Sequence, residues 1–436
     1  MYSCEGRNPD WVPAFAGTQY GVWHSAASHA RQRGMEGLTS SERDCVERAS
    51  EAPMLGQVEA WAAVNSGSRN LAGLATTFGL LADAFAELPG EVRALDAAPV
   101  DAIDAAGQAY DLPHGQNLHL KVRADAPVQL LLTGHMDTVF AVDHPFQALT
   151  WIEDGVLGGP GVADMKGGIA VMLAALYAFE TSPLRDQLGY EVVLNSDEEV
   201  GSLGSAALIA AAARGKRAAL TYEPSALPDG TLAGARPGSG NFSFTVRGRS
   251  AHAGRNPEDG RNALLAAADL ALRLKAGVTS TLSVNPAKID GGSPNNVVPD
   301  LAVLRVNLRP ASLDDQARAG SLIERSVREV AASHDVMIDV HGHFARPPRP
   351  VTPTMEALFG IVKQAGADLG QTIWWQPTGG VCDGNNIAAC GVPVIDTMGV
   401  RGGKIHSIEE YLIVDSLAER AALSALTLIR LAGEAA

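Results

Sequence analysis

Five separate segments of the chain each place a histidine or an acidic side chain at the end of a predicted strand or in a glycine-rich loop. These side chains are His135, Asp164, Glu199, Glu223 and His406. Each has an ordinary explanation when taken alone: a hydrogen-bonded surface histidine, an aspartate that caps a helix, or an acidic turn in water. Five such placements in one chain are difficult to attribute to coincidence. Together they form a set of two imidazoles and three carboxylates.

This mixture of nitrogen and carboxylate ligands suits zinc, cobalt or manganese rather than calcium. Two histidines and three carboxylates can serve two ions only if one carboxylate bridges them. Two divalent ions about 3.5 to 4 Å apart lower the pKa of a shared water toward 7, which supplies hydroxide at neutral pH. A further carboxylate must accept the proton of that water. Glu198, which directly precedes Glu199, is the natural candidate.

The predicted elements indicate how these separate segments could meet. Four stretches show the apolar or alternating pattern of strands in a sheet: residues 117–124, 128–133, 191–194 and 218–222. Residues 167–179 are apolar almost all round, as expected of a helix buried against a sheet. Strands that alternate with helices indicate an α/β sheet with its chemistry at the strand ends. Because side chains alternate along a strand, His135 and Asp137 point the same way at one such end.

A second unit interrupts this pattern between about residues 234 and 349. Its predicted elements follow the order β-α-β-β-α-β, which is typical of ferredoxin-like domains. They are a strand at 242–246, a helix at 262–275, strands at 279–289 and 301–308, a helix at 313–333 and a strand at 336–343. Glycines before this unit and prolines after it indicate hinges. We therefore predict an inserted α+β domain at residues 236–349 within an α/β domain made of 40–235 and 350–436.

The N-terminal part differs from the rest of the chain. Residues 1–39 show neither helical nor strand periodicity, so we predict disorder, or an extension upstream of a true start at Met35 or Met54. Residues 40–64 and 71–88 carry apolar residues at helical spacing and are predicted to form two packed helices. The basic start and apolar stretch of a signal peptide are missing from the sequence.

Composition sets limits on partners and location. The chain has 436 residues, and its 34 Lys and Arg against 49 Asp and Glu give a formal charge of −15. This balance argues against a nucleic acid or an anionic membrane surface as the partner. No stretch of the sequence approaches the roughly 18 unbroken apolar residues that a membrane-spanning helix needs. The four cysteines make no disulfide framework and no zinc-ligand spacing, which favours a reducing compartment. The cytoplasm is the predicted location, because an export signal is missing.

The chain resembles the dinuclear-zinc metallopeptidases that include glutamate carboxypeptidase, acetylornithine deacetylase and succinyl-diaminopimelate desuccinylase. Five motifs occur in the order of that family, from about residue 40 to the end. Three segments look closest to the glutamate carboxypeptidase: His135–Val139, Gly159–Asp164 and Asp197–Glu199. The resemblance implies a three-layer catalytic domain of the zinc-exopeptidase type, with an inserted ferredoxin-like domain that forms a dimer and acts as a lid.

The resemblance also assigns the metal ligands. It implies that Asp164 bridges two divalent ions, most simply zinc, with cobalt or manganese as alternatives. His135 and Glu223 would complete one site, and Glu199 and His406 would complete the other.

Further roles follow from the same resemblance. Glu198 would be the general base, and Asp137 would orient His135. Ser250-Ala-His252-Ala-Gly254 looks like the motif whose histidine reaches the partner subunit's active site and stabilises the oxyanion, which implies a homodimer. Asn296 resembles an asparagine that contacts substrate across that interface. Without the resemblance, His252 would be interpreted as a surface histidine and Asn296 as a turn residue.

Arg346 resembles an arginine that binds the carboxylate of the substrate, a role suited to a bidentate guanidinium. Arg349 and Arg309 lie nearby in the sequence and are alternatives for that role. Asp383, in a Gly-Gly-x-x-Asp loop, is predicted to be structural or to support a ligand.

The sequence thus predicts a metal-dependent hydrolase that cleaves the amide bond of a small carboxylate-bearing substrate. Both a peptide with C-terminal glutamate and an N-acyl amino acid fit this description, and the sequence leaves the choice open. The alternative is a non-catalytic protein that binds a small molecule or metal on the same scaffold, since a fold does not fix a function. Loss of the base or of a ligand would mark that alternative, and neither is missing from the sequence.

Overall fold

The computed structural model describes residues 37–434. The disorder or extension predicted for residues 1–39 therefore lies almost entirely outside the described residues. Helix α2 (Ser40–Ser50) buries one apolar face in the core and packs against α11 (Asp415–Gly433). A chain that started at Met54 would lack α2, so the core as described needs residues upstream of that methionine.

The prediction of one helix over residues 40–64 is wrong, because the structure divides this segment into α2 and α3 (Met54–Ala62). Pro53 lacks a backbone N–H and disfavours helical geometry in the residue before it, so α2 ends at Ser50. The second predicted helix is present as α4 (Leu71–Phe85), which begins where the Asn70 side chain accepts a hydrogen bond from the helix backbone.

The main body of the described chain is built on a six-stranded sheet with the order β1-β4-β8-β5-β9-β16. In chain order its strands are β1 (Glu91–Leu95), β4 (Asn117–Val122), β5 (Val128–His135), β8 (Leu188–Asn195), β9 (Ala218–Thr221) and β16 (Val394–Ile395). β5 lies between β8 and β9 and runs parallel to both. The carboxyl ends of these three strands therefore meet at one edge of the sheet, as the apolar runs predicted.

Helices cover both faces of this sheet. One face, with Leu130 and Leu132, packs against a large core that includes α2, α3, α5 (Gly167–Glu180), α9 (Pro353–Asp368) and α11. The other face, with Leu131, packs against α6 (Ala206–Ala213) and α10 (Asp383–Ala389). The body is thus a three-layer α/β structure. In the described part of the chain, one helical segment, Val162–Glu180, is long and apolar enough to span a membrane, and it is 94% buried inside the protein.

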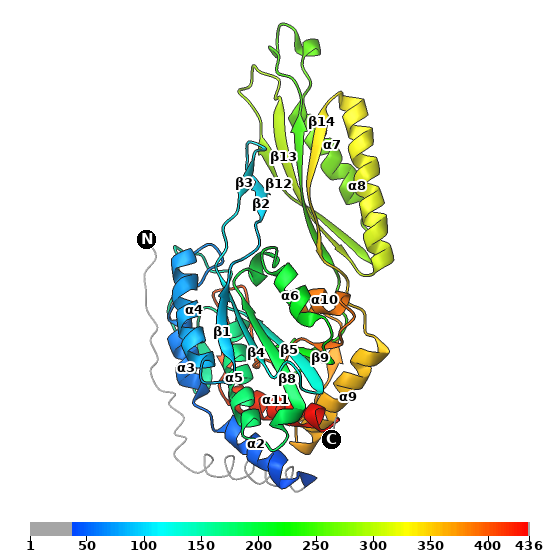
Figure 1. Ribbon diagram of the computed structural model, residues 1–436. Helices are drawn as coiled ribbons and strands as arrows, with labels where there is room; N and C mark the ends of the chain where they lie inside the picture. The colour runs from blue at the N-terminus through cyan, green and yellow to red at the C-terminus, as the bar shows by residue number, and fades with distance from the viewer. Residues whose placement is uncertain (1–36, 435–436) are drawn as a thin grey trace, which may run out of the picture.

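The inserted unit has its own sheet and its own core. Its elements are β11 (Ser239–Arg247), α7 (Ala263–Ala276), β12 (Leu282–Gly291), β13 (Leu301–Pro310), α8 (Leu313–His334) and β14 (Met337–Arg346). The strand order is β12-β13-β11-β14, with every neighbouring pair antiparallel. This is the ferredoxin-like arrangement that the sequence predicted. We call this unit the lid, because it projects from the body at the top of Figure 1.

Small sheets connect the loops around the site. One has the order β17-β18-β7-β6, and its strands are β6 (Thr150–Glu153), β7 (Val156–Gly158), β17 (Gly402–Gly403) and β18 (Tyr411–Ile413). It holds the glycine-rich loop after β7 beside the loop that contains His406. Short strands β10 (Leu232–Ala233) and β15 (Trp375–Gln376) pair near the base of the lid, and β2 (Asp101–Ile103) pairs with β3 (Ala109–Asp111).

The two linkers between body and lid are tied to each other and to the body. Arg236 and Arg349 exchange a pair of backbone hydrogen bonds, each 2.9 Å long. Both guanidinium groups contact the fully buried carboxylate of Asp396, with Arg349 Nη2 at 2.6 Å. The side chain of Asn385 donates to the carbonyl oxygens of Pro237 and Pro347, one on each linker. The base of the lid is therefore fixed by a small buried polar network.

Replacing Asp396 by asparagine should destabilise the protein by about 3 kcal/mol, because it leaves two buried arginines without their counter-charge. Burial alone would raise the pKa of Asp396, but Arg236 and Arg349 hold it below its usual range. The ionised carboxylate thus stabilises the fold at neutral pH, and this contribution is lost as pH falls through the lowered pKa. Urea denaturation at pH 7 and at decreasing pH measures both effects. The exposed pair of Asp335 with Arg261 offers a control, and Asp335→Asn should change stability by less than about 1 kcal/mol.

Candidate metal centre

Three parallel strands bring three of the predicted site segments to one edge. His135 is the last residue of β5 and lies opposite Asn195, the last residue of β8. The chain continues from β8 into the short helical turn η4 (Glu198–Val200), which carries the predicted base and a predicted ligand. On the other side of β5, strand β9 ends at Thr221, two residues before Glu223. Neighbouring strand ends thus place an imidazole between two groups of carboxylates.

The glycine-rich loop delivers Asp164 to the same place. Gly161 has a φ of +73°, and a Cβ atom there would lie 2.7 Å from the Thr138 side chain, so only glycine fits this turn. The side chain of Glu410 accepts hydrogen bonds from the backbone N–H groups of Ala163 and Asp164, both 3.1 Å long. Glu410 therefore fixes the loop that presents Asp164, although no role was predicted for it.

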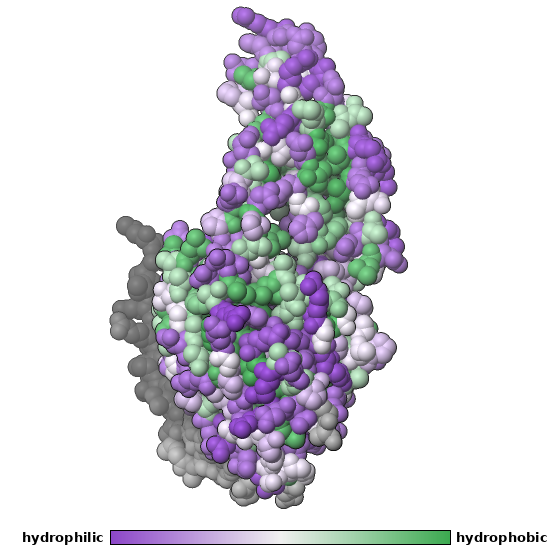
Figure 2. All heavy atoms as spheres, viewed as in Figure 1, coloured by the Kyte–Doolittle hydropathy of each residue, from purple (hydrophilic) through white to green (hydrophobic). Residues whose placement is uncertain are grey.

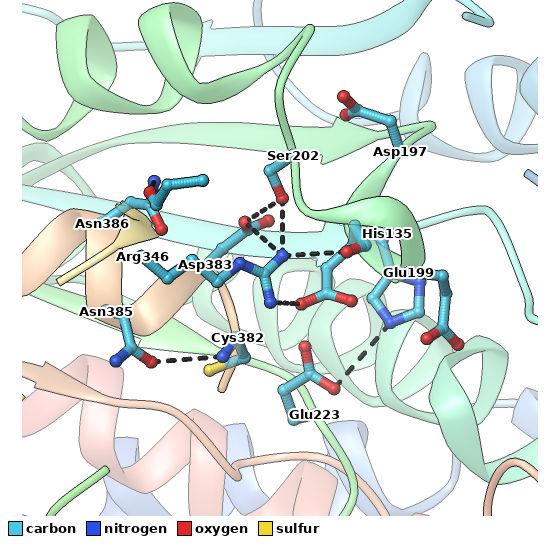
Figure 3. Close-up of polar contacts among 12 residues, drawn as sticks. His135, Asp197, Glu199, Ser202, Glu223, Arg346, Cys382, Asp383, Asn385 and Asn386 are labelled. Atoms are coloured by element: carbon cyan, nitrogen blue, oxygen red, sulfur yellow. Dashed lines mark hydrogen bonds and ion pairs between the residues drawn. The ribbon is translucent and has the colours of Figure 1, made fainter. Parts of the chain in front are cut away.

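The five predicted ligands lie together around Asp164. Its Oδ1 atom is 3.1 Å from Nε2 of His135, and its Oδ2 atom is 3.3 Å from Nε2 of His406. Nε2 of His135 is also 3.8 Å from Glu223 Oε2, and Nε2 of His406 is 3.0 Å from Glu199 Oε2. Figure 3 shows the imidazole of His135 turned toward Glu223. Each oxygen of Asp164 thus faces a different histidine, and each histidine has a glutamate of its own.

The chemistry of this donor set fits a pair of divalent cations. Burial, together with the charge of Asp164, raises the pKa of Glu199 to about 8, and burial also raises the pKa of Glu223 to about 8. Glu223 Oε1 is buried without a hydrogen-bond partner. Hydrogen bonds with Asp164 and Glu199 raise the pKa of His406 to about 11. Carboxylates crowded this closely repel one another, and cations would neutralise them and take the same imidazole nitrogens.

Asp137 links His135 to the turn that carries the glutamates. Its carboxylate oxygens accept hydrogen bonds from the backbone N–H groups of Glu198, at 3.1 Å, and Glu199, at 3.2 Å. Nδ1 of His135 lies 3.0 Å from the Asp137 carbonyl oxygen and 3.4 Å from Oδ1 of the same residue. Ser68, from the loop before α4, donates a 2.7 Å hydrogen bond to the Asp137 carboxylate. One buried aspartate thus orients an imidazole and holds the following turn, with a serine that the sequence did not single out.

Glu198 is positioned by Arg346, a residue of the lid's last strand. Nη1 of Arg346 is 2.6 Å from Glu198 Oε1, and Nη2 donates to the Glu198 carbonyl oxygen at 2.9 Å. The same Nη2 donates to Ser202, whose hydroxyl also contacts Asp383 (Figure 3). Asp383 accepts a further hydrogen bond from Asn195 at 2.9 Å. The predicted base and the predicted substrate arginine therefore form a buried ion pair with each other.

These groups open on a cavity of about 970 Å³ between the body and the lid. The body contributes Asp164, Glu198, Glu199, Glu223 and His406 to its lining, and the lid contributes Asn241, Asn285, Asn307 and Arg309. Arg346 also lines the cavity, whereas Arg349 is fully buried against Asp396 and does not. This volume lies at the upper end of the range of about 300 to 1,000 Å³ for pockets that bind small molecules.

His252 and Asn296 do not join this site. They lie next to each other, since the N–H of Ala253 donates to the Asn296 carbonyl oxygen at 2.9 Å. His252 follows the end of β11, and Asn296 follows the end of β12. Both strand ends lie at the end of the sheet that is remote from the hinges, where Arg247 pairs with Leu301. This end is at the top of Figure 1 and is mostly hydrophilic in Figure 2.

The length of the lid separates His252 and Asn296 from the metal centre. Ser239 lines the cavity, and β11 runs eight residue steps from Ser239 to Arg247. At about 3.3 Å per step, the strand alone spans about 26 Å. His252 and Asn296 are therefore too far along the lid to reach the metal centre of their own chain.

Comparison with known proteins identifies relatives over most of the chain. The model of peptidase family M20/M25/M40 matches residues 131–430. Carboxypeptidase G2 from Pseudomonas sp. (strain RS-16) is 32% identical over 319 residues, which cover 71% of this chain and 76% of that protein. The succinyl-diaminopimelate desuccinylase of Maricaulis maris (strain MCS10) is 30% identical over 373 residues, covering 77% and 91%. The YXEP protein of Bacillus subtilis, a dinuclear metal-binding peptidase, has a similar fold, with a TM-score of 0.61, 14% identity and coverage of 87% and 97%.

Proposed function

The chain belongs to peptidase family M20/M25/M40 and is a hydrolase, and from this premise we propose that it cleaves the amide bond of a small substrate that bears a free carboxylate. One observation carries the proposal. Asp164 lies between two histidines at the floor of the cavity, with one carboxylate oxygen toward each, while Glu198 lies beside them. The expected enzyme class and family resemblance are confirmed by the comparisons. The substrate and the roles of individual residues are our proposal.

We propose that two divalent ions bind around Asp164, which would bridge them. His135 and Glu223 would hold one ion, and Glu199 and His406 would hold the other. Zinc, cobalt and manganese all accept these ligands. When bound, such a pair lowers the pKa of an intervening water and polarises a carbonyl group.

Glu198 would accept the proton of the attacking water and return it to the nitrogen of the leaving amine. Its position supports this role, because it is adjacent in sequence to a ligand but is held by Arg346 rather than by a histidine. Asp137 supports the geometry by fixing the backbone N–H groups of Glu198 and Glu199. The lid lines one side of the cavity, where it would help exclude bulk water during the reaction.

The carboxylate of the substrate needs a cation, and the cavity offers two arginines. Arg346 is buried and paired with Glu198, but its Nε atom is buried without a partner. Arg309 is exposed in the cavity and donates to the Gly379 carbonyl oxygen at 3.0 Å. We propose Arg346 for this role and retain Arg309 as the alternative. Arg349 is no longer a candidate, because it does not line the cavity.

A turnover screen with metal-loaded protein tests the proposed function. The substrates would be N-acyl amino acids and peptides with C-terminal glutamate, each paired with a carboxamide analogue that lacks the free carboxylate. We expect turnover of at least one carboxylate substrate and a much lower kcat/KM for its matched amide, since buried guanidinium groups discriminate strongly in favour of a carboxylate. Equal rates on both members of every pair would contradict the carboxylate requirement. Absence of turnover on all of them would contradict the proposed reaction.

We propose further that two copies of the chain form a dimer through the lid at residues 236–349, with 40–235 and 350–436 as the catalytic domain. The remote position of His252 supports this proposal, because only another copy could bring that imidazole to a metal centre. In the active site, His252 of the second copy would donate a hydrogen bond to the developing oxyanion. Asn296 would contact substrate across the same interface.

Mixing two inactive variants should restore activity. A dimer of Glu198→Ala subunits lacks the base, and a dimer of His252→Ala subunits lacks the oxyanion donor. In a mixed dimer, the subunit with intact Glu198 receives the intact His252 of its partner. Random reassortment should therefore recover about a quarter of wild-type activity, because half of the dimers are mixed and each has one complete site. Mixtures that stay as inactive as the separate variants would show that His252 does not act across subunits.

The cytoplasmic location, predicted from the missing export signal, stays a proposal. Within residues 37–434, Cys45, Cys382 and Cys390 are all free thiols, two of them buried. This state is compatible with a reducing compartment.

A further inference from the structure

The open face of the lid sheet carries polar side chains that line the active-site cavity. Helices α7 and α8 cover the other face, where residues such as Phe244 and Leu308 form the core of the lid (Figure 1). Their sequence neighbours point the opposite way, because side chains alternate along a strand. Asn241 on β11 pairs in register with Asn307 on β13, and both line the cavity. Neither asparagine has a role in the proposed reaction.

The amide of Asn307 is held in one orientation. Its Oδ1 atom accepts a 3.1 Å hydrogen bond from Nε of Arg309. Its Nδ2 atom donates to Ser239 Oγ at 3.0 Å and to the Gly240 carbonyl oxygen at 3.3 Å. A guanidinium N–H can only donate and a backbone carbonyl can only accept, so exchanging the two ends of the amide would break both contacts.

This orientation determines which end of Asn241 is left free. Nδ2 of Asn307 donates to Oδ1 of Asn241 at 2.8 Å, so the oxygen of Asn241 is engaged. Asn241 is exposed, and its Nδ2 atom has no hydrogen-bond partner among the residues that the structure describes. The chain of hydrogen bonds begins at the charged guanidinium of Arg309, and each bond polarises the next. Asn241 therefore presents an oriented and strengthened N–H donor to the cavity.

Asn285 on β12 does not share this property. It lies on the other side of Asn307 in the sheet and also lines the cavity. Its side chain makes no hydrogen bond to any described residue, so nothing fixes which end of its amide faces a ligand. A donor that is already oriented binds more strongly, because less freedom is lost on binding. Asn241 is therefore the better candidate for contact with a ligand.

The free donor lies apart from the arginine proposed for the carboxylate of the substrate. Ser239 pairs in register with Arg346, whose guanidinium contacts Glu198. Asn241 is two residues farther along β11, which is about 7 Å at about 3.3 Å per residue. The two positions therefore suit two different groups of one ligand.

We propose that Asn241 determines specificity by donating a hydrogen bond from Nδ2 to an oxygen of the substrate other than its free carboxylate. A second carboxylate or a carbonyl oxygen can accept this bond, whereas an ammonium or an alkyl group would leave the donor without a partner. Asn307 is a positioning residue, because it acts only through Asn241. The inference rests on the proposed function, since it assumes that the substrate binds between body and lid.

Binding of uncleavable ligands tests the proposal. Each ligand would keep the free carboxylate and carry a methylene group in place of the scissile N–H. Its second group would be a carboxylate, a methyl ketone or an isopropyl group, placed on the acyl chain in one series and on the amino-acid side chain in another. These three groups are similar in shape, and only the first two contain an acceptor oxygen.

Calorimetry on the metal-loaded protein gives the dissociation constant of each ligand. We define the affinity advantage as the dissociation constant of the isopropyl ligand divided by that of the carboxylate or ketone ligand. In at least one series, we expect wild type to show an advantage for both acceptor ligands. Asn241→Leu lacks the donor, and it should reduce the advantage of the carboxylate ligand about tenfold.

Asn307→Asp tests the orientation of the amide. It keeps an acceptor for Arg309 but replaces the N–H by an oxygen, so Asn241 should turn its nitrogen toward that oxygen and its own oxygen toward the cavity. The affinity advantage should again be lost. His343→Leu is the control, because it changes an exposed neighbour of Asn241 on β14 outside the cavity lining. It should leave the advantage unchanged, and melting temperatures check that every variant folds.

An affinity advantage that persists in Asn241→Leu or in Asn307→Asp would overturn the proposal. An equal loss of affinity for all three ligands would overturn it too, because Asn241 would then contact the free carboxylate that they share. Hydrolysis of the corresponding amides by wild type, measured separately, tests the proposed function. Hydrolysis without an affinity advantage contradicts only the role of Asn241, and an advantage without hydrolysis contradicts only the proposed reaction.

Discussion

Replacing Glu198 by glutamine should lower kcat by about 10²- to 10⁴-fold while leaving the bound metal unchanged, because the variant loses the proposed general base but no proposed ligand. Glutamine preserves the shape of the side chain and keeps an oxygen that can accept a hydrogen bond from Arg346. Without that oxygen, the buried guanidinium would lose its partner at this position. Glu198→Ala removes that oxygen as well, so it should add a loss of stability to the loss of turnover.

The measurement needs three readouts on one preparation: kcat, metal content by mass spectrometry and the melting temperature. Glu47→Gln, an exposed change on α2, serves as the matched control and should alter none of them. A metal-loaded Glu198→Gln enzyme with wild-type turnover would disprove the assignment of the base. Loss of metal in the same variant would instead identify Glu198 as a ligand.

Asp164→Ala should abolish the binding of both metal ions and reduce turnover to background. Its two oxygens face different histidines, so removing the carboxylate takes a ligand from each proposed site at once. His406→Ala and Glu223→Gln each remove a ligand from one proposed site, and each should leave about one equivalent of metal bound.

Metal titration followed by equilibrium dialysis measures these stoichiometries directly. Asp44→Asn, on the exposed side of α2, controls for the loss of an acidic residue. If Asp164→Ala still binds two equivalents, Asp164 is not the bridge. If the two single-site variants lose both ions together, the sites are coupled, and the simple division between His135 with Glu223 and His406 with Glu199 fails.

Local patterns predicted most of the elements. The apolar runs became β5, β8 and β9, and the six elements of the lid appear in the predicted order, because a buried strand and an amphipathic helix each impose a periodicity that survives in the sequence. The structure contradicts the single helix predicted over residues 40–64, because Pro53 lies between α2 and α3 while the apolar spacing continues across it. Proline interrupts a helix through its own geometry, whatever the surrounding pattern.

The contacts of the candidate site were harder to predict than its members. Glu410 supports the loop of Asp164 by accepting two backbone hydrogen bonds, and Ser68 supports Asp137 by donating one to its carboxylate. Nothing in their local sequence distinguishes them from surface residues, although Glu410 shares the glycine-rich loop with His406. The ion pair of Arg346 with Glu198 joins residues 148 positions apart, and no periodicity records such a contact.

The sequence by itself determined the donor types and their placement at strand ends, because hydrophobic periodicity defines strands and the residues that follow a buried parallel strand must emerge at its carboxyl edge. Only the tertiary structure decided which donors face each other, and that His252 and Asn296 lie at the remote end of the lid. Pairwise distances depend on how strands are ordered, how loops fold over them and where a rigid inserted sheet points. Those quantities arise from packing of the whole chain, so a short stretch of sequence does not contain them.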